Sequence, residues 1–155
     1  MYKGLLHLHS ALRWVILILL LVAIFRSIAD SKKPFTSGHR KTGLFLVICA
    51  DLMLLIGFYQ WFAGDLGLKS IQLNGMSVVM KNSMLRFFAV EHLVGMLIAI
   101  ILIHVGYSYA KKNIADAIKH RRTILFYGLS LLIILISIPW PFRLVGHGRS
   151  WFPGV

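Results

Sequence analysis

Apolar residues dominate four long stretches of the chain, at about residues 10–29, 42–63, 84–109 and 123–140. Each stretch is close to the ~20 residues that an α-helix needs to cross a hydrocarbon core of ~30 Å. None has the alternation of apolar and polar positions that is typical of barrel strands, and a helix satisfies its own backbone hydrogen bonds. The pattern predicts an all-α, integral membrane four-helix bundle that occupies residues 1–155 as one domain.

Composition supports this class of protein, because 58% of the residues are hydrophobic. The first apolar stretch also resembles a signal peptide, with Lys3 before it and the small residues Ser27 and Ala29 after it. Arg26 and Lys32 follow the stretch directly and would oppose export of that flank. We therefore expect an uncleaved first helix.

The formal net charge of +12 is distributed unevenly along the chain. Lys and Arg gather in the connections after the first and third helices, whereas the 64–82 loop and both termini carry fewer. By the positive-inside rule the two basic connections face the cytoplasm, and both termini and the 64–82 loop face outward. We expect contact with the lipid bilayer and no nucleic-acid binding, since no soluble domain is present to carry it. The basic residues of the two connections are Arg26, Lys32, Lys33, Arg40, Lys41, Lys111, Lys112, Lys119, Arg121 and Arg122.

Two segments, "HRKTGLF" (39–45) and "HRRTILF" (120–126), share five of seven residues and each opens an even-numbered helix. They suggest two tandem helical hairpins, with the first and third helices parallel; a chance match of two basic, leucine-rich segments is an equally good explanation. His39 and His120 lie in these basic clusters, where we expect them to act as interfacial anchors.

The segment "HLHSALRW" (7–14) places two histidines at the start of the first helix. His9 and His92 then fall at the same depth on two parallel helices, the arrangement in which two imidazoles ligate one haem iron. His7 and His9 are ~200° apart on a regular helix, so one of them faces the interior. Because helical side chains lean towards the N-terminus, Arg13 would reach back to a haem propionate or to Glu91.

Three more side chains belong to this hypothesis or to its alternatives. Arg86 is a second candidate for the propionate. Asp51, near the midpoint of the second helix, would cost ~2.5–3.5 kcal/mol as an ionised carboxylate, and with Glu91 it could form a proton path for quinol chemistry. The alternative is that Asp51 stays neutral and hydrogen-bonds a neighbouring helix. Cys49 is the lone cysteine, so no disulfide or thiolate metal cage forms within the chain.

The blocks "HLHSALRW", "KNSMLRFFAVEH" (81–92), "HVGYS" (104–108), "LLIILISIPWPFR" (131–143) and "SWF" (150–152) together cover nearly the whole chain. With them the chain resembles a family of small bacterial four-helix inner-membrane proteins that are often labelled cytochrome b. The resemblance implies a multi-pass protein of the bacterial cytoplasmic membrane with bound haem b. The family pattern falls on His7, His9, Arg13, Arg86, Glu91 and His92.

The leading hypothesis is a b-type haem protein that exchanges electrons with quinone or a respiratory-complex subunit; whether it is an enzyme stays open. The alternative is a haem-free accessory or assembly subunit, in which Arg13–Glu91 and Asp51 contacts fasten the helices together. A zinc or copper site built from His7, His9, Glu91 and His92 ranks below haem, because helical spacing splays the first two. A transporter ranks third.

Overall fold

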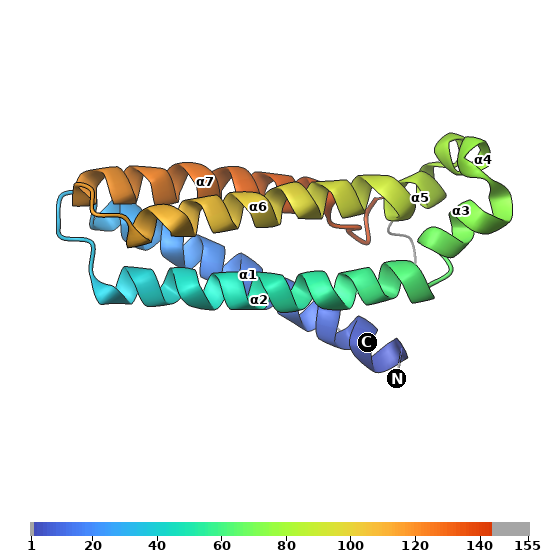
Figure 1. Cartoon of the computed structure of the whole chain (residues 1–155), viewed down its shortest axis with the longest axis horizontal. Helices are drawn as coiled ribbons and strands as arrows, with labels where there is room; N and C mark the ends of the chain where they lie inside the picture. Colours follow the sequence, from blue (N-terminus) through green and yellow to red (C-terminus); the bar gives the residue numbers. More distant parts are fainter. Residues whose placement is uncertain (1, 144–155) are drawn as a thin grey trace.

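The computed structural model describes residues 2–143, which form helices joined by short connections, with no strand among them. Four long helices run side by side (Figure 1). They are α1 (Tyr2–Ala29), α2 (Ser37–Ala63), α6 (His92–Lys111) and α7 (Asp116–Ser137). The short helices α3 (Leu68–Asn74), α4 (Met76–Lys81) and α5 (Ser83–Arg86) and the π-helical segment η1 (Phe87–Glu91) lie between α2 and α6.

The all-helical prediction is confirmed, and each of the four long helices is long and apolar enough to cross a membrane. Their starts differ from the prediction. α1 begins at Tyr2 and α2 at Ser37, ahead of the apolar runs at 10 and 42, and α7 begins at Asp116 and not at 123. Polar residues at these ends keep helical geometry because each is followed by a long run that propagates the helix. α7 ends at Ser137, two residues before Pro139, as a proline stop predicts.

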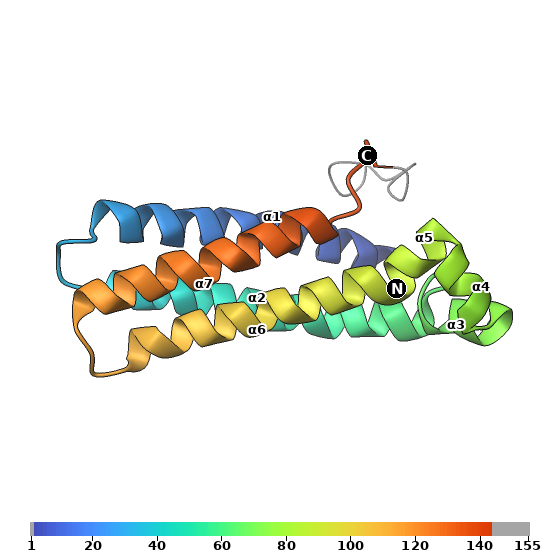
Figure 2. The same cartoon turned by 90° about the horizontal axis from the view of Figure 1, so that it is seen from above.

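The four long helices form a ring in the order α1, α2, α6, α7, in which each helix packs against the next and α7 packs against α1. α1 and α6 are therefore diagonal neighbours, and so are α2 and α7. α1 and α6 run in the same direction, as the tandem-hairpin hypothesis expects (Figure 2). The connections 30–36 and 112–115 lie at one end of the bundle, named here the loop end. The start of α1 and the segment α3 to α5 lie at the other, named the open end.

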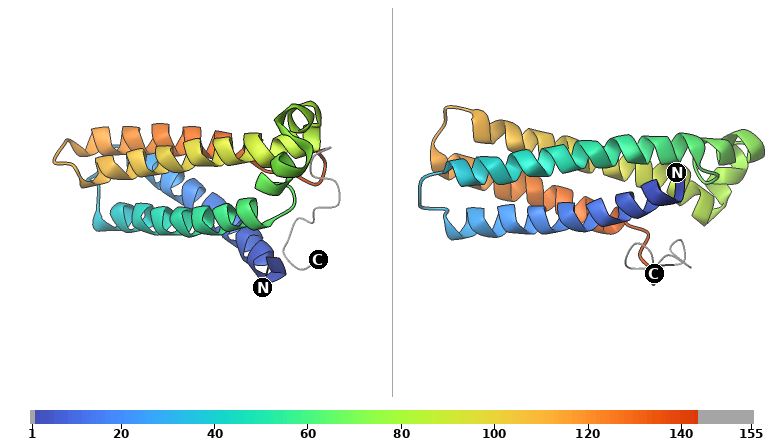
Figure 3. Two further views of the ribbon diagram at one scale, coloured as in Figure 1. Left: turned by 45° about the vertical axis from the view of Figure 1, so that its right-hand side comes forward. Right: turned by 90° about the horizontal axis from the view of Figure 1, so that it is seen from below.

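At the open end the first turns of α1 diverge from the other helices (Figure 3). The 64–82 segment, for which no helix was predicted, contains α3 and α4, which are separated by Gly75 in the left-handed region at φ 78°. A side-chain amide hydrogen bond from Gln60 to the Leu5 carbonyl, 3.1 Å long, ties α2 to the diverging part of α1. The open end is thus held by side chains of α2 and by the short helices.

Small residues of α6 pack against α7. A Cβ added at Gly95 would collide with the Ser137 hydroxyl, and Ala99 is fully buried. The Ser130 hydroxyl donates to the Ala99 carbonyl over 3.0 Å. These residues bring α6 and α7 into close contact, so their small size serves helix packing. The C-terminal end, which is predicted to face outward, lies outside the described residues.

Candidate functional site

His9 and His92 face each other across the α1–α6 diagonal near the open end, with ring centroids 6.4 Å apart and ring planes inclined by 55°. The His9 ring lies against the α2 backbone, where a Cβ added at Gly57 would be 3.4 Å from its Cε1 atom. His9 Nδ1 is buried and has no hydrogen-bond partner among residues 2–143. The predicted pair of imidazoles is therefore brought together, and His9, not His7, is the histidine of α1 that faces the interior. His7 lies on the exposed side of α1.

The His92 ring is oriented by α7. Its Nδ1 atom donates a hydrogen bond of 2.7 Å to the Ser137 carbonyl. That carbonyl lies at the end of α7, where helical carbonyls lack an intrahelical partner. A bond of this kind fixes both the tautomer and the orientation of a histidine that ligates a metal through its other nitrogen.

The π-helical segment η1 directly precedes His92 and sets the side chains around it. Its Phe87 and Phe88 rings have centroids 5.9 and 6.5 Å from that of His92. The Trp61 indole donates a hydrogen bond of 2.9 Å to the Ala89 carbonyl and so holds α2 against this segment. Single π-helical turns are frequent at functional sites, because the wider turn redirects side chains.

Two charged groups of the candidate site pair with each other. Arg86 Nε donates to Glu91 Oε1 over 2.6 Å, and Arg86 also donates to the Met80 carbonyl over 3.0 Å. Arg13 lies on the half-buried side of α1, one turn after His9, with its guanidinium carbon 5.3 Å from the Trp14 ring. The carboxylate of Glu91 is thus satisfied by Arg86, a partner that the sequence analysis did not assign to it.

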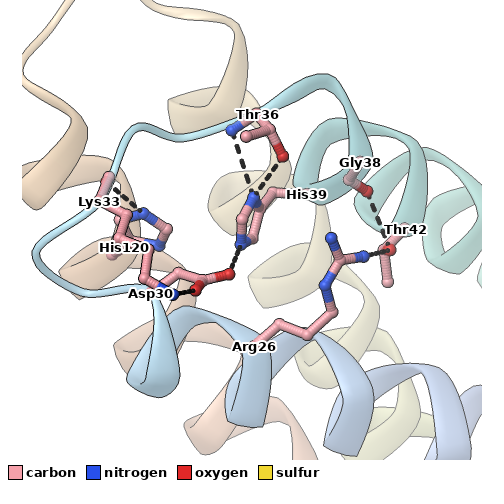
Figure 4. Close-up of polar contacts among 8 residues, drawn as sticks. All are labelled: Arg26, Asp30, Lys33, Thr36, Gly38, His39, Thr42 and His120. Carbon is pink, nitrogen blue, oxygen red and sulfur yellow. Dashed lines mark hydrogen bonds and ion pairs between the residues drawn. The ribbon is translucent and has the colours of Figure 1, made fainter.

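His39 and His120 form a second histidine pair, across the α2–α7 diagonal at the loop end (Figure 4). Their rings meet edge to face with centroids 5.0 Å apart, and Phe35 packs against both. Both side chains are buried, His120 fully. The expectation of interfacial anchors is wrong for these two residues, because their neighbours Arg40 and Arg121 take the exposed positions while the rings face the bundle axis.

The hydrogen bonds at the loop end fix the tautomers of the two rings. His39 Nδ1 accepts from the Thr36 backbone N–H, so the Nε2 hydrogen faces Asp30, whose Oδ2 lies 3.3 Å away. His120 Nε2 donates to the Lys33 carbonyl over 3.3 Å. The two rings therefore contact Asp30 and Lys33 and hold the 30–36 connection against the end of the bundle.

A cavity of about 10 Å³ lies beneath this pair, with room for about one water molecule. The Ser27 hydroxyl in its lining is buried and has no hydrogen-bond partner among the described residues. Arg26 donates to the Thr42 hydroxyl over 3.2 Å at the same place. The cavity suits a structural water and is too small for an organic ligand.

Asp30 is an acidic residue of the loop end, and it lies outside the four long helices. The hydrogen bond from Lys33, 2.9 Å long, holds the pKa of its carboxyl below the ordinary 3.8, and the nearby His39 acts in the same direction. Asp30 therefore carries its charge at neutral pH and joins the end of α1 to the start of α2.

Asp51 contacts His104, an α6 residue that the sequence analysis left unassigned. Asp51 Oδ1 and His104 Nε2 are 2.8 Å apart on the outer surface between α2 and α6. Glu91 precedes His104 by 13 residues, ~20 Å along a helix, so the two carboxylates of the predicted proton path do not meet directly. Among residues 2–143 no group of three or more His, Cys, Asp or Glu could hold a metal ion, which is the geometry that the zinc or copper hypothesis required.

The fold and these contacts define an all-helical protein with four helices long enough to span a membrane and one histidine pair at each end of the bundle. No protein-family model, curated protein or solved structure matches the chain.

Proposed function

We propose that the chain is a membrane-spanning b-type haem protein that transfers electrons, with one haem held by His9 and His92. The observation that carries the proposal is the 6.4 Å separation of the two ring centroids. Two metal–imidazole bonds of ~2 Å each, plus the distance from each ligating nitrogen to its ring centre, give a centroid separation of roughly 6 Å. The pair therefore matches ligation of one iron from both sides.

The surroundings of the pair also fit this group. His92 is oriented by the Ser137 carbonyl, and the buried Nδ1 of His9 has no partner among the described residues. Phe87 and Phe88 provide apolar walls. When bound, haem supplies one-electron redox chemistry, and the protein tunes its potential through the ligands, hydrogen bonds and burial.

The charged residues at the open end have separate tasks in this proposal. Arg13 and Arg86 offer cationic donors to the propionates, and Arg86 would exchange its bond to Glu91 for that contact. Asp51, which hydrogen-bonds His104 on the bundle surface, is not part of the haem site.

We further propose that the loop end faces the cytoplasm of a bacterium and the open end faces outward, since the larger share of Lys and Arg flanks the loop end. The haem site would then lie near the outer face, within reach of quinone or of a respiratory partner. The family resemblance of the "HLHSALRW" and "KNSMLRFFAVEH" blocks supports the same assignment.

The deciding measurement is a reduced-minus-oxidised visible spectrum of the detergent-purified protein from cells supplied with haem, with a pyridine haemochrome assay for stoichiometry. We expect one haem b per chain, and its loss in His9→Ala and in His92→Ala. His7→Ala is the matched control, because it removes an exposed histidine from the same helix. A featureless spectrum from folded protein would overturn the proposal.

The second candidate is a haem-free accessory subunit, which is favoured by the Arg86–Glu91 and Asp51–His104 contacts because these already use their charges to join elements of the fold. In that case His9→Ala would leave the protein folded and unchanged in its spectrum. Glu91→Ala would instead reduce the yield of folded protein.

A further inference from the structure

The Asp51–His104 contact lies on the outside of the bundle and not in its core. The Asp51 side chain is 48% exposed and that of His104 is 46% exposed. Asp51 stands at the middle of α2, far from both ends of that helix. About half of the surface of each side chain therefore faces the medium that surrounds the middle of the bundle.

The surface around this pair is apolar. On α2 it is flanked by Ile48 and Leu55, and on α6 by Ile101, one turn before His104, all exposed; Ser108, one turn after His104, is half-buried and donates to the Val105 carbonyl of its own helix. If α2 crosses a bilayer as proposed above, these side chains meet hydrocarbon. Ionisable residues at such depth almost always face protein or water and pair with one another. The Asp51–His104 pair thus lacks the cover that its position requires.

Each member of the pair also has a second polar atom. The contact uses Asp51 Oδ1 and His104 Nε2. It leaves Asp51 Oδ2 and His104 Nδ1, each of which needs a partner away from water. A pair with no net charge carries two exchangeable protons. Both lie on the imidazolium when the acid is a carboxylate, and one lies on each group when the pair is a carboxylic acid and a neutral imidazole. In both arrangements one further donor and one further acceptor point outward.

We propose that the α2–α6 face, defined by Ile48, Asp51, Leu55, Ile101 and His104, is the interface between two copies of this chain. A two-fold axis brings the same patch of both copies together, so that Asp51 of each copy faces His104 of the other. Asp51 Oδ2 of each copy then meets His104 Nδ1 of the other, which closes a ring of four hydrogen bonds. The apolar side chains around the ring exclude lipid from it.

A second copy fits this patch better than another kind of occupant. The patch contains one acid and one base, so its charge is balanced and complementary to itself after a two-fold rotation. Lipid chains offer neither a donor nor an acceptor. On α1 and α7 the outward positions at mid-helix include apolar residues such as Ile18 and Leu132, which suit lipid directly.

Cross-linking in membranes tests the interface on the full-length protein. In a Cys49→Ala background, single cysteines are introduced at Leu55→Cys and Ile101→Cys, and the controls are Ile18→Cys on α1 and Leu132→Cys on α7. All four parent side chains are exposed to a similar degree, 66%, 59%, 58% and 55% respectively. We expect a covalent dimer on oxidation at the first two positions and none at the controls. Equal cross-linking at all four, or adducts with a different protein, would overturn the proposal.

The polar ring is tested by counting subunits in nanodiscs by single-molecule photobleaching. The variant Asp51→Leu/His104→Leu removes both polar groups from the surface and leaves the core intact, so it is expected to fold, as circular dichroism can check. We expect its dimer association constant to fall about tenfold or more, because the two hydrogen bonds between the copies are lost. Wild-type protein that is monomeric at every protein-to-lipid ratio would also refute the interface.

The interface and the haem site are independent of each other, since neither Asp51 nor His104 belongs to the His9–His92 site. A dimer without haem would leave this inference standing, and haem in a monomer would leave only the proposed function. Resistance to carbonate extraction reports membrane insertion separately from both.

Discussion

His39 shows at the scale of one residue how a histidine can serve as a helix cap. Its Nδ1 accepts from the backbone N–H of Thr36, the residue before α2, and its ring is buried between Phe35 and His120. The orphan N–H groups at a helix start are usually satisfied by Ser, Thr, Asp or Asn side chains. Here an imidazole accepts the hydrogen bond from the Thr36 N–H, and its buried ring also fills the end of the core.

We expect His39→Ala to lower the free energy of unfolding by about 1–3 kcal/mol, because the Thr36 N–H loses its partner and the buried imidazole loses its contacts with Phe35 and His120. Titration with sodium dodecyl sulfate in mixed micelles measures the change. Arg40→Ala is the control, and as an exposed substitution it should shift stability by about 0.5 kcal/mol or less. Equal transitions for His39→Ala and the wild type would exclude a capping role.

Asp30 gives the loop end a defined response to acid. Its pKa is lowered in the folded protein by Lys33, so the folded state binds the proton less readily than the unfolded state. The stabilisation is therefore complete above the ordinary value of 3.8 and is lost as the pH falls through the lower, folded pKa.

We expect the wild type to be more stable than Asp30→Asn at pH 6, and the difference to disappear at a pH below the folded pKa of Asp30. Unfolding transitions of both proteins, measured between pH 2.5 and 6 in steps of about half a pH unit, would show how the difference in their free energy of unfolding decreases. A difference that persists at the acid end would mean that Asn disturbs the loop by some other route.

At the scale of elements, the most extensive packing is between α6 and α7. Gly95 stands where α6 passes the Ser137 hydroxyl, and a Cβ there would also lie 3.1 Å from Ser137 Cβ. Ser137 in turn provides the carbonyl that orients His92. The packing of α6 on α7 and the orientation of the candidate ligand therefore depend on the same turn of α7.

We expect Gly95→Ala to destabilise the fold by about 1–3 kcal/mol through overpacking. Gly128→Ala on α7 is the matched control: an added Cβ meets nothing within 4 Å there, so it should be neutral or stabilising by up to about 1 kcal/mol. Detergent unfolding measures both, and adding Ser137→Gly to Gly95→Ala should restore part of the loss. An unaffected Gly95→Ala would show that α6 and α7 can separate at no cost.

The sequence predicts the helices well within long apolar runs. It predicts their ends poorly, because polar residues continue a helix beyond its apolar run. Four helices follow directly from the four runs, but the ends were misplaced because Lys3, His7 and Arg40 interrupt hydropathy without interrupting the backbone. α3 and α4 were missed, since the segment 64–82 is short of periodic signal and is punctuated by glycine. Helix continuation depends on hydrogen-bond cooperativity, which hydropathy alone does not report.

The histidine pairs show the same limit at the scale of the site. The juxtaposition of His9 and His92 follows from counting depth along two parallel helices. The repeat aligns His39 with His120, and the buried Thr123 and Tyr127, three and seven residues after His120, lie on the same face of α7 as that histidine. Their basic neighbours obscured this signal. The Asp51–His104 contact joins helices of opposite direction at a register that only the packed bundle defines.

At the scale of the whole molecule the helices differ in length. α1 has 28 residues and α7 has 22, lengths of ~42 and ~33 Å, whereas the hydrocarbon core is ~30 Å thick. A helix that exceeds the core tilts or thickens the surrounding lipid. In a bilayer α1 would relieve this mismatch through its first turns, which diverge from the other helices (Figure 3). Acyl-chain length would then act on the position of α1 at the open end and so on the distance between His9 and His92, which makes the thickness of the host membrane a determinant of the geometry of this histidine pair.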